Sequence, residues 1–128
     1  MHINQTLLTV RRGSVLEQPV DAVVNAANTD MRGGGGVDGA IHKAAGPGLL
    51  DELVLVAPEG APTGKVVVTG GHRMPVPFLF HVAGPIWNGG QEGEPEQLAS
   101  CYRGCVQEAH LRGLESLAFC SISTGIFG

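Results

Sequence analysis

The stretch that decides the fold covers residues 22–28, which read AVVNAAN, and residues 33–42, which read GGGGVDGAIH. It opens with a short, almost wholly apolar run, which predicts a strand at 22–26 that is buried on both faces of a sheet. A helix is expected from near Val37 to Gly46, because Gly46 precedes a proline and this pairing commonly ends a helix. Ligands of α/β sheets bind beyond the carboxyl ends of strands, and glycines entering a helix offer free amides to phosphate. The stretch therefore predicts a diphosphate site.

Each part of this stretch also has an interpretation that involves no ligand. The glycine run could be a flexible linker, although four consecutive glycines between a buried strand and a well-ended helix favour a shaped loop. Asp38 falls in the first turn of the expected helix, where a carboxylate favours the helix dipole, and Asn28 could simply shape a turn. His42 lies four residues beyond Asp38 on the same helix face, and it could be structural. Taken one at a time, these residues leave both interpretations open.

The rest of the chain predicts strands that alternate with helices. The 128 residues fit one compact domain, 1–128, because domains usually run from about 50 to 250 residues. Helical spacing of apolar residues predicts a long helix at 96–112, with Gly113 as its cap. A short helix at 49–56 and further strands are expected, the strands at 7–10, 65–69, 78–83 and 117–122. This alternation indicates an α/β layered domain.

Composition and charge exclude several classes of function. The net charge of −4 disfavours a general nucleic-acid binder, because such proteins present basic surfaces to phosphates. Apolar runs stop far short of the roughly 20 residues of a membrane span, and the first residues lack a signal-peptide pattern. A cytoplasmic protein without a membrane partner is therefore expected. The odd number of cysteines, three, predicts reduced thiols.

Three weaker patterns do not support other chemistry. Residues 60–66 are one residue short of a P-loop and have a valine at the magnesium-binding position. Cys101, Cys105 and His110 could suggest zinc, but both cysteines fall on the apolar stripe of the expected long helix, which predicts core packing. Cys120 has no evident histidine partner for nucleophilic catalysis. No metal site is expected.

The deciding stretch, together with several shorter motifs, resembles the signature of MacroD-type macrodomains. The shorter motifs are AAGP at 44–47, TGK at 63–65, TGG at 69–71, LFH at 79–81, GP at 84–85 and ISTGIFG at 122–128. The order of two separated loop motifs makes the pattern specific. The resemblance implies a three-layer α/β/α fold with a mixed sheet, and a cleft for ADP-ribose at the strand ends.

The resemblance also implies roles for individual residues. Asn28 would contact the distal ribose, Asp38 would position or activate the attacking water, and His42 would support this region. A first phosphate loop would consist of Gly34, Gly35, Gly36 and Val37. A second phosphate loop would consist of Ser123, Thr124, Gly125, Ile126 and Phe127. Further ligand-binding residues are expected at Ser14, Val15 and Asn25. The implied reaction is hydrolysis of the ester that joins ADP-ribose to a protein carboxylate, or of an O-acyl-ADP-ribose. It needs no metal and no cofactor.

Two departures from the family pattern affect these expectations. Where the family has an aspartate for the adenine amino group, this chain has Ser14, so a charge-assisted hydrogen bond is lost and adenine selectivity is in doubt. Asp21, which precedes the strand at 22–26, is interpreted as a loop residue rather than a replacement. The family also continues beyond Gly128 with a helix, a strand inside the sheet and a closing helix. Without these, strand edges near Leu7 and Leu117 are expected to be open.

Three functions therefore stay open. The first is a hydrolase that removes ADP-ribose from modified proteins. The second is a non-catalytic module that binds ADP-ribose or ADP-ribosylated proteins, which the Ser14 departure and the ending after Gly128 favour. The third is a fragment that has lost the site and persists through an oligomer or a complementing segment, which the ending after Gly128 favours.

Overall fold

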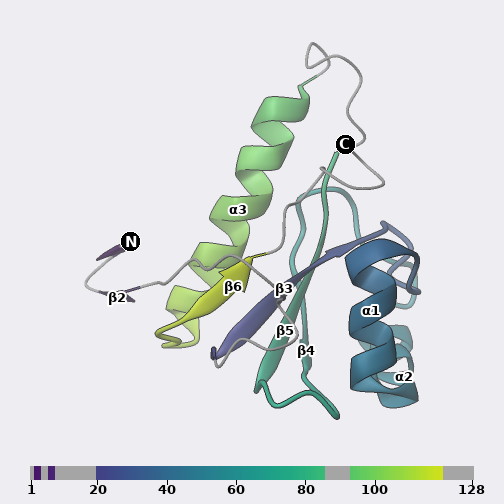
Figure 1. Ribbon diagram of the computed structural model, residues 1–128. Coiled ribbons are helices and arrows are strands. Elements are labelled where there is room, and N and C mark those ends of the chain that lie inside the picture. The colour runs from purple at the N-terminus through teal and green to yellow at the C-terminus, as the bar shows by residue number, and fades with distance from the viewer. Residues whose placement is uncertain (1, 4–5, 8–19, 86–92, 120–128) are drawn as a thin grey trace.

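The structure is a computed structural model that describes residues 2–3, 6–7, 20–85 and 93–119. Strands and helices alternate along most of its length (Figure 1). In chain order, the elements are β1 (His2–Ile3), β2 (Thr6–Leu7), β3 (Ala22–Ala27), α1 (Gly36–Ala45), α2 (Pro47–Val56), β4 (Val67–Gly70), β5 (Phe78–Ala83), α3 (Glu94–Leu111) and β6 (Leu117–Phe119).

The central sheet has the strand order β4-β5-β3-β6. Strand β3 pairs in parallel with both β5 and β6, and β4 runs antiparallel to β5, so the sheet is mixed. Helices α1 and α2 pack on one face, against β3 and β4, and α3 covers the other face against β5 (Figure 1). This three-layer α/β/α arrangement confirms the predicted fold class. It also explains the apolar run in β3, because a central parallel strand is buried on both faces.

The junction between the first two helices differs slightly from the sequence prediction. Helix α1 ends at Ala45, and Gly46 caps it with a φ of +84°, a positive φ that glycine adopts without strain. Helix α2 then begins at Pro47 rather than at Leu49. A proline fits the first turn of a helix because its missing N–H has no partner there in any case. The Gly46-Pro47 pair therefore ends one helix and starts the next.

Other element boundaries also differ from the predictions. Strand β4 begins at Val67 rather than Lys65, because the Lys65 amide donates to Pro62 in a turn. Helix α3 begins two residues earlier than Glu96, with Pro95 in its first turn. Leu7 ends β2, which forms a two-stranded ribbon with β1, and residues 8–10 and 120–122 of the predicted strands lie outside the described residues. Among the described residues, β6 pairs only with β3.

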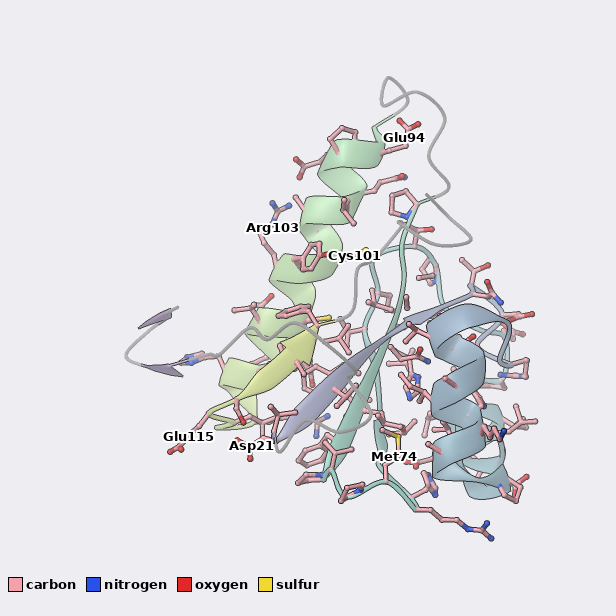
Figure 2. The ribbon with its side chains drawn as sticks, viewed as in Figure 1. Asp21, Met74, Glu94, Cys101, Arg103 and Glu115 are labelled. Atoms are coloured by element: carbon pink, nitrogen blue, oxygen red, sulfur yellow. The ribbon has the colours of Figure 1, made fainter. Side chains whose placement is uncertain are left out.

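Apolar side chains fill the space on both sides of the sheet. Ile41, Leu49 and Leu53 are fully buried on α1 and α2, and Phe80 is fully buried on β5. Cys101 and Cys105 are buried on α3, as the apolar stripe predicted, and neither forms a disulfide among the described residues. The Cys101 thiol contacts the carbonyl of Ala83. Arg103, by contrast, points away from the sheet into solvent (Figure 2).

The described residues offer neither a metal site nor a membrane-spanning helix. No cluster of three or more His, Cys, Asp or Glu side chains there could hold a metal ion. None of the helices described is long and apolar enough to cross a membrane.

Candidate functional site

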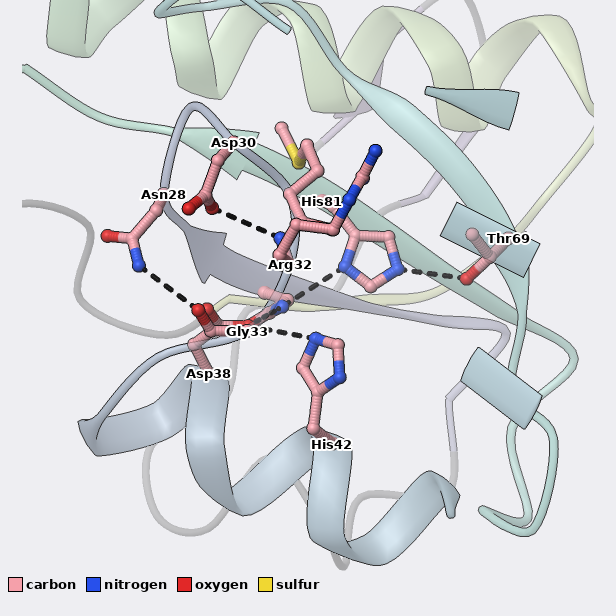
Figure 3. Close-up of polar contacts among 10 residues, drawn as sticks. Asn28, Asp30, Arg32, Gly33, Asp38, His42, Thr69 and His81 are labelled. Carbon is pink, nitrogen blue, oxygen red and sulfur yellow. Dashed lines mark hydrogen bonds and ion pairs between the residues drawn. The ribbon is translucent and has the colours of Figure 1, made fainter. Parts of the chain in front are cut away.

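Polar side chains gather between α1 and the sheet, on an otherwise apolar face. Asn25 on β3 and His81 on β5 are partners in the parallel register, so their side chains share one face of the sheet. Helix α1 lies over that face and contributes Asp38 and His42 (Figure 3). Asn25, His81 and Asp38 are each at most 4% exposed. Buried polar groups are costly unless they are hydrogen-bonded, so their partners identify what the site is built to do.

Asp38 is held by only one of its two oxygens. Its Oδ1 accepts a hydrogen bond of 2.8 Å from Nδ2 of Asn25 and lies 3.4 Å from Nε2 of His42. Its Oδ2 is buried and has no hydrogen-bond partner among the described residues. Burial raises the pKa of Asp38, and the charge of Asp30 adds to this increase. The hydrogen bond from Asn25 and the charge of His42 act in the opposite direction and lower this pKa. The result is an oriented carboxyl group with one oxygen free to accept.

The free oxygen of Asp38 faces the glycine loop beside Asn28. A Cβ atom placed on Gly34 would lie 2.5 Å from Nδ2 of Asn28 and 3.4 Å from Oδ2 of Asp38. Only a glycine lets the main chain approach both side chains this closely. Nδ2 of Asn28 in turn donates to the carbonyl of Gly33 over 3.4 Å (Figure 3). Asn28, Gly34 and Asp38 therefore form one contiguous group.

His42 completes the group from the next turn of α1. A Cβ atom on Gly33 would lie 3.6 Å from three atoms of the His42 ring, so the glycine backbone passes over the face of the imidazole. Gly33 has a φ of +91°, which a residue with a side chain rarely adopts. The ring is partly buried, and its Nε2 has no hydrogen-bond partner among the described residues. Its contact with Asp38 is the 3.4 Å approach given above.

The glycine loop leads directly into the start of α1. Gly35 is the N-cap residue of this helix, and because it has no side chain, no side-chain hydrogen bond caps the helix start. The first amides of a helix have no partner within the helix, and they carry the positive end of its dipole. Gly34, Gly35, Gly36 and Val37 are all exposed. The loop can therefore present several N–H groups to an anion.

A second loop, at residues 57–61, holds the segment between β3 and the glycine run. The guanidinium of Arg32 donates to the carbonyls of Ala57 and Pro58 over 3.0 Å and 2.7 Å. The amide of Ala61 donates to the carbonyl of Thr29 over 2.8 Å. These hydrogen bonds hold the backbone of residues 29–32 against the end of α2. They thereby set the positions of Asn28 and of the first residue of the glycine run.

His81 and Thr69 belong to the site, although the sequence analysis gave neither a role. Nδ1 of His81 lies 3.1 Å from Nδ2 of Asn25, and its Nε2 lies 2.9 Å from the Thr69 hydroxyl. Burial lowers the pKa of His81 to about 3, with repulsion from His42 and His72 in the same direction. Both residues are inside quoted motifs, TGG and LFH, and a histidine in a buried apolar strand was the available signal.

The structure thus brings together one part of the predicted site. Asn25, Asn28, Asp38, His42 and the loop from Gly34 to Val37 lie in one place, with Asn25 fully buried beneath the others. The remaining predicted residues, Ser14, Val15 and Ser123, Thr124, Gly125, Ile126 and Phe127, lie outside the described residues. Asp21 is in a bend before β3, as interpreted, where its carboxylate accepts hydrogen bonds from the amides of Glu115 and Ser116.

This fold, with a glycine loop between a central parallel strand and a helix that carries a buried acid, is that of a macrodomain. The macro domain family matches residues 24–128, and the chain belongs to this family. A macro domain-containing protein of Methanosarcina mazei is 45% identical over 128 residues, which cover 100% of this chain and 67% of that protein. An O-acetyl-ADP-ribose deacetylase of Salmonella newport is 44% identical over 123 residues, which cover 94% of this chain and 69% of that protein.

Solved structures give the same family. The Oceanobacillus iheyensis macrodomain with ADP is 42% identical with a TM-score of 0.87, and the match covers 100% of this chain and 70% of that one. The Trypanosoma brucei macrodomain in complex with ADP-ribose is 38% identical with a TM-score of 0.84, covering 99% of this chain and 56% of that one. These findings confirm the macrodomain resemblance that the motifs indicated.

Proposed function

We propose that this chain binds ADP-ribose and hydrolyses ADP-ribosyl esters, either O-acyl-ADP-ribose or ADP-ribose joined to a protein carboxylate. The observation that carries the proposal is the state of Asp38. Its Oδ1 is anchored by Asn25, and its Oδ2 is buried, unpartnered among the described residues and directed at the glycine loop. A carboxyl oriented in this way suits a group that accepts a proton or a hydrogen bond from a water next to a bound ligand.

The glycine loop supplies the binding half of the proposal. The exposed backbone of Gly34 to Val37 precedes an uncapped helix start, and such a start is a ready site for phosphate. A diphosphate held there would place the attached distal ribose near Asn28, whose amide lies beside Gly34. Ser123 to Phe127 are proposed as the second phosphate loop, and Ser14 and Val15 as the adenine contacts, on the motifs alone.

The comparisons support the same substrate class. A relative with 44% identity is named O-acetyl-ADP-ribose deacetylase, and solved structures of other relatives hold ADP or ADP-ribose. Other relatives of similar identity carry names that state only the macro domain, so the catalytic step stays a proposal for this chain. No metal or cofactor is required for the step, and ADP-ribosylated proteins are the proposed macromolecular partners.

The reaction consumes one water for each ester. The water oxygen bonds to the electrophilic carbon of the ester, Oδ2 of Asp38 takes one water proton, and the bond between that carbon and the leaving oxygen breaks. The proton on Asp38 then passes to the leaving oxygen, which restores the carboxylate. The products are ADP-ribose and a free acid. A higher pKa makes Asp38 a stronger base, so the burial that raises this pKa also favours the step. Holding water and ester at a fixed distance supplies the remaining advantage.

Incubation with O-acetyl-ADP-ribose tests the proposal. We expect release of acetate and ADP-ribose by the wild type, and a rate at least about 100-fold lower for Asp38→Asn, because general-base groups commonly contribute 100-fold or more. Asp51→Asn is the matched control, since it removes one carboxylate from the exposed side of α2. Equal rates for wild type and Asp38→Asn would count against the role of Asp38.

Calorimetry with ADP-ribose separates binding from catalysis. Binding without hydrolysis would favour the alternative of a non-catalytic ADP-ribose reader. Absence of heat with ADP-ribose would contradict both functions.

A further inference from the structure

A line of three buried side chains continues from Asp38 away from the glycine loop. We refer to Asn25, His81 and Thr69 as the buried relay, because each contacts the next across the three neighbouring strands β3, β5 and β4 (Figure 3). All three are at most 2% exposed. The successive distances from Asp38 Oδ1 are 2.8 Å to Asn25, 3.1 Å from Asn25 to His81 and 2.9 Å from His81 to Thr69.

The orientation of the Asn25 amide follows from Asp38. A carboxylate only accepts hydrogen bonds, so the atom of Asn25 that lies 2.8 Å from Oδ1 must be the donating nitrogen rather than the oxygen. The same nitrogen carries a second hydrogen, and that hydrogen points at Nδ1 of His81. Nδ1 of His81 is therefore the acceptor and carries no proton.

The tautomer of His81 follows from this contact. A neutral imidazole has one donating and one accepting nitrogen, so an accepting Nδ1 requires a proton on Nε2. Burial keeps the ring neutral, because it lowers the pKa of His81 to about 3. Nε2 then donates to the Thr69 hydroxyl, and that hydroxyl donates in turn to the carbonyl of Gly70 over 3.1 Å. The contacts of the buried relay thus have one consistent arrangement of protons.

The hydrogen bonds within the buried relay do not by themselves explain why polar side chains occupy this part of the core. Three apolar side chains would fill this space without the cost of burying polar atoms. The arrangement also leaves Oδ1 of Asn25 and Oδ2 of Asp38 buried without partners among the described residues. A half-satisfied network is costly to bury, which argues against a purely stabilising role. What the buried relay does achieve is to assign the roles of the two Asp38 oxygens.

We propose that Thr69 and His81 are positioning residues, which lock Asn25 as a donor to Oδ1 so that Oδ2 of Asp38 remains the oxygen that faces the ligand. This inference rests on the proposed hydrolase function and deepens it. Without the Thr69 hydroxyl, the proton on Nε2 of His81 loses its acceptor. The ring can then exchange tautomers, and an Nδ1 proton would repel the Asn25 donor. Asp38 would lose its fixed orientation, while the glycine loop would keep its contacts with ADP-ribose.

Thr69→Val tests this directly because valine has the shape of threonine without the hydroxyl. We expect kcat on O-acetyl-ADP-ribose to fall about tenfold, the rate equivalent of one lost hydrogen bond, with the Kd for ADP-ribose within about twofold of the wild type. Thr69→Ser keeps the hydroxyl and should restore most of the rate. Val106→Ala on α3, in the opposite layer, removes packing without touching the buried relay and should leave kcat unchanged.

The predicted His81 tautomer can also be measured in the wild type, so this test does not depend on whether a variant folds. Nitrogen-15 NMR of the imidazole rings should show His81 neutral, with the proton on Nε2, throughout the range from about pH 5 to 8, because its pKa is about 3. A proton on Nδ1 in an active chain would overturn the buried relay alone. So would a folded Thr69→Val variant with the kcat of the wild type. A wild type that has the Nε2 proton but hydrolyses nothing would instead contradict the proposed function, and with it the catalytic purpose of the buried relay.

Discussion

Asp38 is a carboxyl group that the fold buries almost completely, with 4% of its side chain exposed. Burial raises its pKa above the value of 3.8 expected for the unfolded chain. A group whose pKa is higher in the folded than in the unfolded state binds its proton more tightly when the chain is folded, so the protonated form stabilises the fold. For Asp38, this stabilisation is fully present below pH 3.8 and is lost as the pH rises through the pKa of the folded state. At neutral pH the charged Asp38 therefore opposes folding.

The substitution Asp38→Asn should for this reason stabilise the protein at neutral pH. Asparagine has nearly the same shape, keeps an oxygen for the Asn25 donor and carries no charge. We expect the free energy of unfolding at pH 7 to rise by on the order of 1 kcal/mol, with a smaller gain near pH 4, where the wild-type carboxyl is more protonated. Urea unfolding at several pH values measures this, with Asp51→Asn as the surface control. A variant less stable than the wild type at pH 7 would contradict the account.

Gly34 is the residue at which the main chain comes closest to the site side chains. Gly34→Ala would place a methyl group 2.5 Å from Nδ2 of Asn28, so that amide must move away from the proposed ribose position. We expect weaker ADP-ribose binding by about tenfold and a loss of stability below about 1 kcal/mol, because Asn28 is only partly buried. Calorimetry and urea unfolding give the two quantities.

A double-mutant cycle isolates the cause of the Gly34 effect. In an Asn28→Ala background the side-chain amide that would clash with the added methyl group is absent. Gly34→Ala should therefore weaken ADP-ribose binding by less in this background than in the wild type. Equal effects in both backgrounds would show that the methyl group acts on the loop backbone rather than on Asn28.

At the scale of elements, the site depends on a contact between two loops. Gly60, with a φ of +77°, packs against the backbone that follows Asn28, and a Cβ atom there would lie 2.1 Å from the carbonyl oxygen of Thr29. That carbonyl also accepts a hydrogen bond from Ala61, so it has little room to shift. The loop at 57–61 is therefore a support for the segment from β3 to α1.

Gly60→Ala should be far more harmful than an alanine at a glycine with a similar φ. We expect a loss of about 3 kcal/mol or more, from the left-handed φ and the backbone clash together. Gly93 has a φ of +85° and open space around it, so Gly93→Ala should lose only the roughly 1 kcal/mol of the backbone conformation. Thermal unfolding of both variants measures the difference. Equal losses would show that the contact with Thr29 is not important.

At the scale of the whole molecule, local patterns predicted more of the fold than of the site. The apolar run of β3, the glycine loop and the Gly46-Pro47 boundary are properties of neighbouring residues, and they were readable from the sequence. The contact from Asn25 through His81 to Thr69 depends on strand register between segments that are 56 and 12 residues apart. No local pattern carries that information, so the buried relay emerged only from the folded chain.

One further long-range contact joins the beginnings of β3 and β6. Oδ2 of Asp21 accepts hydrogen bonds from the amides of Glu115 and Ser116 over 2.8 Å and 3.2 Å, and the Asp21 amide donates to the Ser116 hydroxyl over 2.9 Å. Figure 2 shows Asp21 and Glu115 together at this end of the sheet. The residues are 94 or 95 positions apart, so the contact closes a very long loop. Closing such a loop costs entropy, which these bonds help to offset.

We therefore expect Asp21→Ala to loosen β6 selectively. Losing one acceptor for two amides at a partly exposed site should lower the free energy of unfolding by about 1 kcal/mol. Hydrogen exchange should quicken at Leu117–Phe119, because β6 pairs only with β3 among the described residues, and should stay unchanged in α1. Asp21→Asn keeps an acceptor oxygen and should show a smaller effect. If exchange rises equally in α1 and β6, the bonds of Asp21 stabilise the whole sheet rather than this strand.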